Sequence, residues 1–405
     1  MAFAVSVAGS AVAASTEHEH VALPTDVTLS MTDALDYTVT RYPSFLELDA
    51  RGEEAQAWSE RGDSWLAGQP ALSFRYQTDR WGDDQGLEEF ESGIELPLWR
   101  WGERSAVRSL GAALTTESDL ATVALRWEVA GQLRGVVWDI ALADNDHELA
   151  EEALQTATEL TSIVERRHAL GDVALSDVLL VRTSQLELQS ALIDAQARLL
   201  DTQRAYQSLT MLDRRPAVMA ETQSTRHEIS PEHPALSFIN AELDRAVASQ
   251  LVAENRAKQS PTLLIGPRRE RAAFGDEFDE SVGISVRIPF GGSAHTRTTV
   301  AESVRGTAAV RSARSQLIRA LNLKLHEAAH ELDVARRNLG VAGELASLAE
   351  HQYTMGLSGY ENGELDLIDL LKLRTVMLSA KRRRNALAIE EKRQIAFYNQ
   401  AVGEL

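Results

Sequence analysis

The sequence predicts a mainly α-helical protein with two β-hairpins, in which one arrangement of elements occurs twice. Three observations support this fold class. One short pattern recurs at a fixed offset, 363 − 171 = 192 residues. Two very long stretches keep helical periodicity without a break, and a run of period-two alternation precedes each of them. A fixed offset over this distance indicates an internal duplication rather than chance similarity.

The recurring pattern is Gly, acid, apolar, any, Leu, any, Asp, apolar, Leu, any, apolar, Arg, Thr. It begins once at Gly171 and again at Gly363. In each copy the glycine follows one long helical pattern, and an acidic residue, Asp172 or Glu364, is expected to open the next helix. Glycine is common at the C′ position just after a helix, and acidic side chains are stabilising in the first turn of the next helix. Each copy is therefore predicted to be the tip of a helical hairpin.

The first repeat is expected to span 15–215. Its first helix should begin with Thr32 as the N-cap and continue to Trp65. A β-hairpin follows at 71–98, with apolar residues on one face and acidic residues on the other. After Gly102 a helical pattern of about 68 residues reaches Leu170, a length of ~100 Å at 1.5 Å per residue. Nothing inside a compact domain needs such a helix.

The helix that returns from the first tip carries two neighbouring apolar seams, as a helix needs to pack on both sides. One seam follows steps of three and four, and the other follows steps of seven. The first contains Val178, Val181, Gln185, Leu188, Leu192, Ala195 and Leu199, and the second contains Leu179, Leu186, Ile193 and Leu200. We expect these seams to build a wall of helices curved into a tube.

A polar, aperiodic connector is predicted at 216–231, after which the second repeat, 232–405, restarts the order of elements. Its hairpin is expected at 262–290, its long helix reaches the tip at Gly363, and its return helix begins near Leu365. The prolines at the helix–strand corners suit positions where a missing amide donor costs little.

Composition limits the partners and the compartment. The net charge of −19 argues against nucleic acid, which requires clustered Lys and Arg. The chain has no cysteine for disulfides, thiolate metal sites or lipidation. Residues 1–14 resemble a remnant of a signal peptide whose start lies upstream of Met1. No later apolar run is long enough for a transmembrane helix, so a membrane span would have to use strands.

The predicted order of elements resembles that of the outer-membrane efflux protein family typified by TolC. This order is a helix, a β-hairpin, a very long helix, a glycine tip and a returning helix, and it occurs twice. The resemblance covers the chain after residue 14, and its most specific parts are Gly363 to Leu371 and the corners Pro97-Leu98 and Pro289-Phe290-Gly291-Gly292. It implies a homotrimer in the outer membrane, with a twelve-stranded β-barrel built from four strands per chain and a periplasmic tunnel of long antiparallel coiled-coil helices. Trimerisation also agrees with the physics, because four strands cannot close and open sheet edges are not tolerated in lipid.

The resemblance also implies partners and site residues. A periplasmic adaptor is expected to dock at the tips, and an inner-membrane pump supplies the energy, because the sequence has no phosphate-binding loop. The docking residues are Leu170, Gly171, Asp172, Asn362, Gly363 and Glu364. Asp369 matches an acidic ring position of the aperture, Lys372 occupies the place of a second Asp, and Asp366 is a candidate to compensate.

The amino-acid sequence at the tips is most similar to that of channels paired with heavy-metal cation pumps. Drugs and peptides are the alternative exported substrates. Neither a cofactor nor a resident metal is expected, and no residue is assigned a catalytic role. A solvated terminus is the favoured interpretation of Glu17-His18-Glu19-His20, with weak metal binding as the alternative.

Two other functions compete with the channel. His326-Glu327-Ala328-Ala329-His330 satisfies the zinc-peptidase pattern, in which two His share a helix face. Glu350 is too far along a continuous helix, ~30 Å, to supply a third ligand. The second alternative is a soluble periplasmic coiled-coil adaptor, although adaptors usually have one helical hairpin and more β-structure.

Overall fold

The computed structural model describes residues 23–291 and 293–405. The predicted signal remnant at 1–14 and the segment Glu17 to His20 lie outside these ranges, as does Gly292 of the second corner. Within them the chain divides into two compact units. Of the described residues, unit 1 comprises 23–34, 136–219 and 346–386, and unit 2 comprises 35–135, 220–345 and 387–405.

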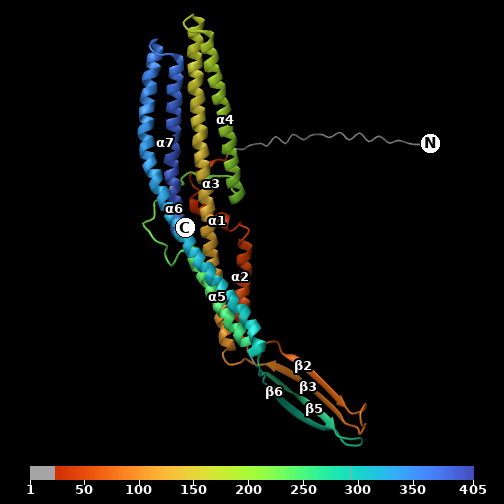
Figure 1. The fold of residues 1–405 in the computed structure, drawn as a ribbon. Helices are drawn as coiled ribbons and strands as arrows, with labels where there is room; N and C mark the ends of the chain where they lie inside the picture. The colour runs from red at the N-terminus through yellow and green to blue at the C-terminus, as the bar shows by residue number, and fades with distance from the viewer. Residues whose placement is uncertain (1–22, 292) are drawn as a thin grey trace, which may run out of the picture. The chain divides into compact units, whose positions relative to one another are not determined.

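Seven helices are found in the described part of the chain, and most of its residues are helical (Figure 1). They are α1 (Met31–Val39), α2 (Phe45–Asp63), α3 (Glu103–Ala169), α4 (Leu175–Thr210), α5 (Pro234–Arg256), α6 (Ser293–Glu361) and α7 (Leu367–Val402). The two very long helices are α3, with 67 residues, and α6, with 69, as the uninterrupted periodicity predicts. No helix in 23–291 or 293–405 is long and apolar enough to cross a membrane.

Both predicted hairpins form, and together they make one antiparallel sheet. Its strands are β2 (Ala71–Thr78), β3 (Glu88–Pro97), β5 (Thr262–Arg271) and β6 (Asp279–Arg287), in the order β2-β3-β5-β6. The junction between hairpins is the β3–β5 pair, which runs from Glu88 opposite Arg271 to Pro97 opposite Thr262. The first hairpin thus extends into the second, and within this sheet β2 and β6 each have one unpaired edge (Figure 1).

The prediction of a single helix from Thr32 to Trp65 is wrong. The chain forms α1 and α2, separated by a turn at 40–44. Pro43 lacks the amide donor for a helical hydrogen bond, and its ring disfavours helical geometry at the preceding residue. Ser30, not Thr32, caps α1: its Oγ accepts from the amide of Asp33 at 3.0 Å, and the Asp33 carboxylate accepts from the amide of Ser30 at 3.2 Å.

Two smaller boundaries also differ from prediction. The acidic residues after the tip glycines do not open the return helices, because α4 begins at Leu175 and α7 at Leu367. The connector is not wholly irregular at its start, since β4 (Arg215–Pro216) pairs in parallel with β1 (Thr25–Asp26). Arg215 also forms an ion pair with the carboxylate of Asp144, so this end of the connector is fixed to α3.

Each unit has its own apolar core. In unit 2, Val107 and Leu110 of α3 pack with Ala55 of α2 and with Val252 of α5. In unit 1, side chains from both helical hairpins meet beneath the two tips. This cluster consists of Leu160, Val164, Val178, Val181, Tyr360, Leu367 and Leu370. The tips are therefore anchored on a shared core instead of standing as separate hairpins.

Candidate functional sites in the helical turns and the sheet

The two helical tips have the same backbone geometry. Gly171 has φ +87° and Gly363 has φ +79°. The amide of Gly171 donates to the carbonyl of His168, and the amide of Asp172 donates to the carbonyl of Arg167, both at 2.9 Å. The amides of Gly363 and Glu364 donate to carbonyls at the same two spacings, at 3.1 and 2.7 Å. This is the glycine C-cap in which the left-handed residue turns the chain back.

The predicted docking residues lie at these turns, and their side chains are open to solvent. Leu170 is 79% exposed. Asp172, Asn362 and Glu364 are also exposed. A Cβ built on Gly171 or Gly363 meets no atom within 4 Å, so the positive φ, rather than lack of space, is what favours glycine there.

The four-stranded sheet has two chemically different faces, because side chains alternate along each strand. One face carries exposed apolar residues from every strand: Leu72, Phe74, Tyr76, Phe90, Ile94, Ile265, Val282, Ile284 and Val286. Exposed aromatic residues flank it, with Trp81 and Phe274 in the hairpin turns and Trp101 and Phe290 just beyond the other strand ends. The arrangement leaves a broad apolar surface between two aromatic levels.

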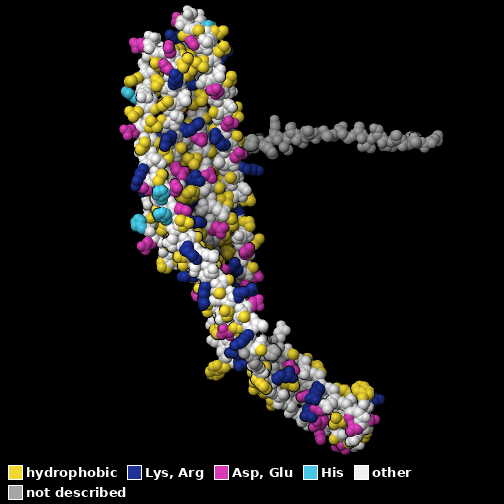
Figure 2. Space-filling model, in the orientation of Figure 1, with side chains coloured by type: hydrophobic (Ala, Val, Ile, Leu, Met, Phe, Trp, Pro, Cys, Tyr) yellow, Lys and Arg dark blue, Asp and Glu magenta, His cyan; other side chains and the backbone are white. Residues whose placement is uncertain are grey.

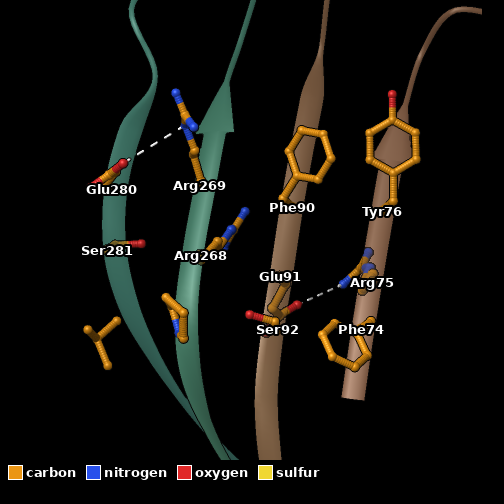
Figure 3. Close-up of a pocket in the computed structure, with 12 residues that line it drawn as sticks. Phe74, Arg75, Tyr76, Phe90, Glu91, Ser92, Arg268, Arg269, Glu280 and Ser281 are labelled. Carbon is orange, nitrogen blue, oxygen red and sulfur yellow. Dashed lines mark ion pairs between the residues drawn. The ribbon is translucent and has the colours of Figure 1, made fainter. Parts of the chain in front are cut away.

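The opposite face is polar and carries a charged row. Arg75, Glu91, Arg268 and Ser281 stand in register across the four strands. A hollow of about 860 Å³ is lined by this row and by the two rows beside it (Figure 3). Those two rows belong to the apolar face, where they include Phe74, Tyr76 and Phe90 but also the ion pair of Arg269 and Glu280. Glu91 lies 3.8 Å from Arg75, while Arg268 turns to Glu89 at 2.9 Å, so the charges are mutually compensated.

Several solved structures share this architecture. The chain aligns with CusC at TM-score 0.73 and 13% identity, covering 93% of this chain and 92% of that one; that protein is described by conformational changes accompanying folding and transmembrane channel formation. The outer membrane protein VceC of Vibrio cholerae gives a TM-score of 0.71 at 13% identity, with 92% and 96% covered. The CmeC outer membrane channel of Campylobacter jejuni gives 0.71 at 16%, with 92% and 85% covered.

The chain has the fold of outer-membrane channels. No family model and no curated protein matches its sequence, so the likeness is one of structure. The fold expected from the resemblance, mainly helical with antiparallel strands, is confirmed. Two of these structural neighbours, CmeC and CusC, are described as channels.

Two of the three predicted aperture residues, Asp369 and Lys372, lie in the first turns of α7, and Asp366 directly precedes it. Lys372 donates from Nζ to Asp369 Oδ1 at 2.9 Å, and both side chains are exposed. The lysine at the position of an expected second aspartate therefore pairs with the first one. Asp366 precedes α7 and its carbonyl accepts from the amide of Leu370, leaving its carboxylate exposed. Such an exposed pair contributes little stability, so its effect is on local charge.

The zinc-peptidase alternative gains no third ligand. His326 and His330 are both exposed on α6. In the described ranges no group of three or more His, Cys, Asp or Glu side chains is placed to hold a metal ion. Two histidines one turn apart do not complete a tetrahedral site with an open catalytic position.

Two arginines that carry no distinguishing pattern in the sequence are buried in this fold. Arg134 is buried in unit 2, where it pairs with Glu221 and donates to Gln400. Arg374 is buried in unit 1 beneath the second tip. The recurring pattern contains Arg374, but a pattern of residue types carries no signal for which arginine is removed from water.

Proposed function

We propose that the protein is the outer-membrane component of a tripartite efflux system, a passive duct formed by three copies of the chain. The observation that carries the proposal is the sheet: four antiparallel strands with two unpaired edges, one exposed apolar face and aromatic residues at both strand ends. In lipid, unpaired strand edges are too costly to persist. Three copies joined edge to edge would give a closed barrel of twelve strands with its apolar face outward.

The helices of unit 1 supply a second argument for the trimer. On α4 the apolar seam whose residues are seven positions apart is exposed. The exposed fractions of Leu179, Leu186 and Ile193 are 57%, 65% and 60%. On α6, Leu348 and Met355 are also seven residues apart and about equally exposed. Figure 2 shows hydrophobic side chains at the surface of the helices. Seams at this spacing are typical of coiled-coil contacts, and a contact between two different surfaces closes into a ring when copies repeat it.

We assign the glycine turns to an adaptor protein and the start of α7 to control of the aperture. Exposed Leu170 and the polar groups at Asp172, Asn362 and Glu364 suit contacts between tips. The energy comes from an inner-membrane pump, because the duct itself is passive. The exported substrate, with heavy-metal cations as one candidate, enters through the aperture region of Asp366, Asp369 and Lys372, and the exit lies beyond the outer membrane.

The first experiment measures where the protein is and how many copies assemble. Isolated outer membranes are extracted in mild detergent, and the protein mass is determined by light scattering after subtraction of the detergent. One chain has a mass of 44.5 kDa, and we expect the extracted particle to have three times this mass. We also expect ion conductance after the protein is inserted into planar bilayers. A monomer in the soluble periplasmic fraction would overturn the channel and favour the adaptor alternative.

The docking assignment has a separate test that uses the absence of native cysteine. Leu170→Cys and Asn362→Cys place a single thiol at each turn, and Val218→Cys places one on the exposed connector. Cross-linking in cells to a co-expressed adaptor should trap a complex through the two turn thiols and none through the connector thiol. Equal trapping at all three positions would contradict docking at the turns.

A further inference from the structure

The two copies of the recurring pattern place an arginine in opposite environments. Arg182 lies eleven residues after Gly171, and Arg374 lies eleven residues after Gly363. The Arg182 side chain is 61% exposed and pairs with Glu165 of α3 at 2.7 Å. Arg374 is 4% exposed. Equivalent positions in two hairpins therefore hold a solvated, paired arginine and a buried one.

Arg374 has little to compensate its charge. Its Nη2 donates to Ser184 Oγ of α4 at 2.6 Å, and its Nε is buried without a hydrogen-bond partner. No carboxylate in the described part of the chain forms an ion pair with Arg374, and Tyr353 of α6 is its neighbouring titratable group. Burial lowers the pKa of the guanidinium, as expected when a cation loses water.

The sequence explains the missing carboxylate. Glu165 lies six residues before Gly171, whereas Leu357 lies six residues before Gly363. Leu357 contributes to the apolar cluster beneath the tips, one helical turn from Tyr353. The second hairpin thus carries the arginine of the pattern but has an apolar side chain at the position of the acid.

We propose that Arg374 is a built-in destabilising residue that favours separation of the two helical hairpins at the α4–α7 contact. Ser184 belongs to the first hairpin and Arg374 to the second, so one hydrogen bond across the contact must offset the desolvation of a charge. Separation of the hairpins returns the guanidinium to water. The inference rests on the proposed duct, in which this end must widen to admit cargo.

The underlying physics is the asymmetry of buried charges. Removing the partner of a buried ion is strongly destabilising, whereas replacing buried ions by apolar side chains of similar volume is often neutral or stabilising. Arg374→Met should therefore hold the hairpins together more firmly. Arg182→Met removes an exposed pair and should have little effect, which makes it the matched control.

The test is amide hydrogen exchange on the full-length protein in detergent, followed by mass spectrometry of peptides covering 176–186 and 365–378. We expect Arg374→Met to slow exchange in both peptides about tenfold or more, because it removes the charge that opposes packing. Leu357→Glu should slow exchange as well, by supplying the acid that Glu165 supplies in the first hairpin. Ser184→Ala should accelerate exchange by removing the one hydrogen bond to Nη2.

Exchange that is unchanged or faster in Arg374→Met, or slowed equally by Arg182→Met, would overturn the proposal. If Arg374→Met does not fold, the opposite shifts of Leu357→Glu and Ser184→Ala decide the matter, and shifts in the same direction reject it. The exchange rates do not depend on conduction. A wild-type protein that forms no pore but shows these shifts would reject the proposed function and leave the role of Arg374 standing.

Discussion

At the scale of single residues, buried polar groups fix segments that are remote in sequence. Arg134 of α3 forms two hydrogen bonds with the Glu221 carboxylate, at 2.7 and 2.9 Å, and donates to the carbonyl of Glu404 at 3.1 Å. Asn399 donates to the same carboxylate. The connector and the C-terminal end of α7 are thereby held to α3 by one guanidinium.

We predict that Arg134→Met lowers the free energy of unfolding by about 2–4 kcal/mol, because it leaves Glu221 without its cation. Chemical denaturation followed by circular dichroism measures the change. The matched control is Arg337→Met, which removes an exposed i,i+4 pair with Asp333 and should cost less than about 0.5 kcal/mol. Equal effects of the two substitutions would contradict the anchoring role.

His233 provides a pH-dependent contribution to stability in unit 2. It is buried at the N-terminus of α5, where its Nδ1 accepts from the amide of Ala235 at 3.2 Å, and its ring lies edge-on to Trp127. Burial lowers its pKa below the ordinary 6.5. The unfolded chain therefore binds the proton more readily, so this stability is present above pH 6.5 and is lost as the pH falls towards the folded-state pKa.

We expect His233→Asn to flatten the pH dependence of the melting temperature below neutrality, because asparagine keeps the cap but does not titrate. Thermal unfolding at a series of pH values is the measurement. His326→Asn, at an exposed position on α6, is the control and should leave the wild-type slope unchanged. A slope that persists in His233→Asn would assign the proton uptake to another group.

At the scale of elements, the sheet depends on glycines that stand together. Gly93, Gly266 and Gly283 are in register on β3, β5 and β6. The β3–β5 ladder is interrupted there, between the Glu91–Arg268 and Ile94–Ile265 pairs. A Cβ built on Gly266 would lie 1.7 Å from the carbonyl oxygen of Ser92. The junction between the hairpins thus requires two backbones to approach more closely than side chains permit.

Gly266→Ala should therefore separate β3 from β5 and lower sheet stability by at least about 2 kcal/mol, since the backbone has to move. Thermal unfolding followed by circular dichroism in the strand region tests this. Gly340→Ala on α6, where a Cβ meets nothing within 4 Å, should instead be neutral or stabilising by about 0.5–1 kcal/mol. A Gly266→Ala protein as stable as Gly340→Ala would show that the strands yield without cost.

At the scale of the whole molecule, the exposed α4 seam decides assembly in the proposed duct. We predict that Leu186→Glu combined with Ile193→Glu reduces the trimer to monomers, because two carboxylates would be buried at the contact without partners. Light scattering in detergent gives the number of copies. Val218→Glu alters an exposed apolar residue of the connector and should remain trimeric. A trimeric double variant would place the interface elsewhere.

Local patterns in the sequence predict the kind and order of the long helices, the hairpin strands and the tips. Period-two runs gave the strands, unbroken helical periodicity gave α3 and α6, and the glycines at 171 and 363 marked both tips, because these are local properties of the chain. These patterns did not locate the break between α1 and α2, where Pro43 overrides an apolar pattern that continues past it.

Which of two equivalent residues is buried depends on contacts between segments that are far apart in the chain. Val181 is buried while Leu186 of the neighbouring seam is exposed, and Arg374 is buried while Arg182 is solvated. The order β2-β3-β5-β6, with β3 beside β5, likewise follows from contacts between residues far apart in the chain. Burial depends on which surfaces meet across such distances, and periodicity within one segment carries no record of its neighbour.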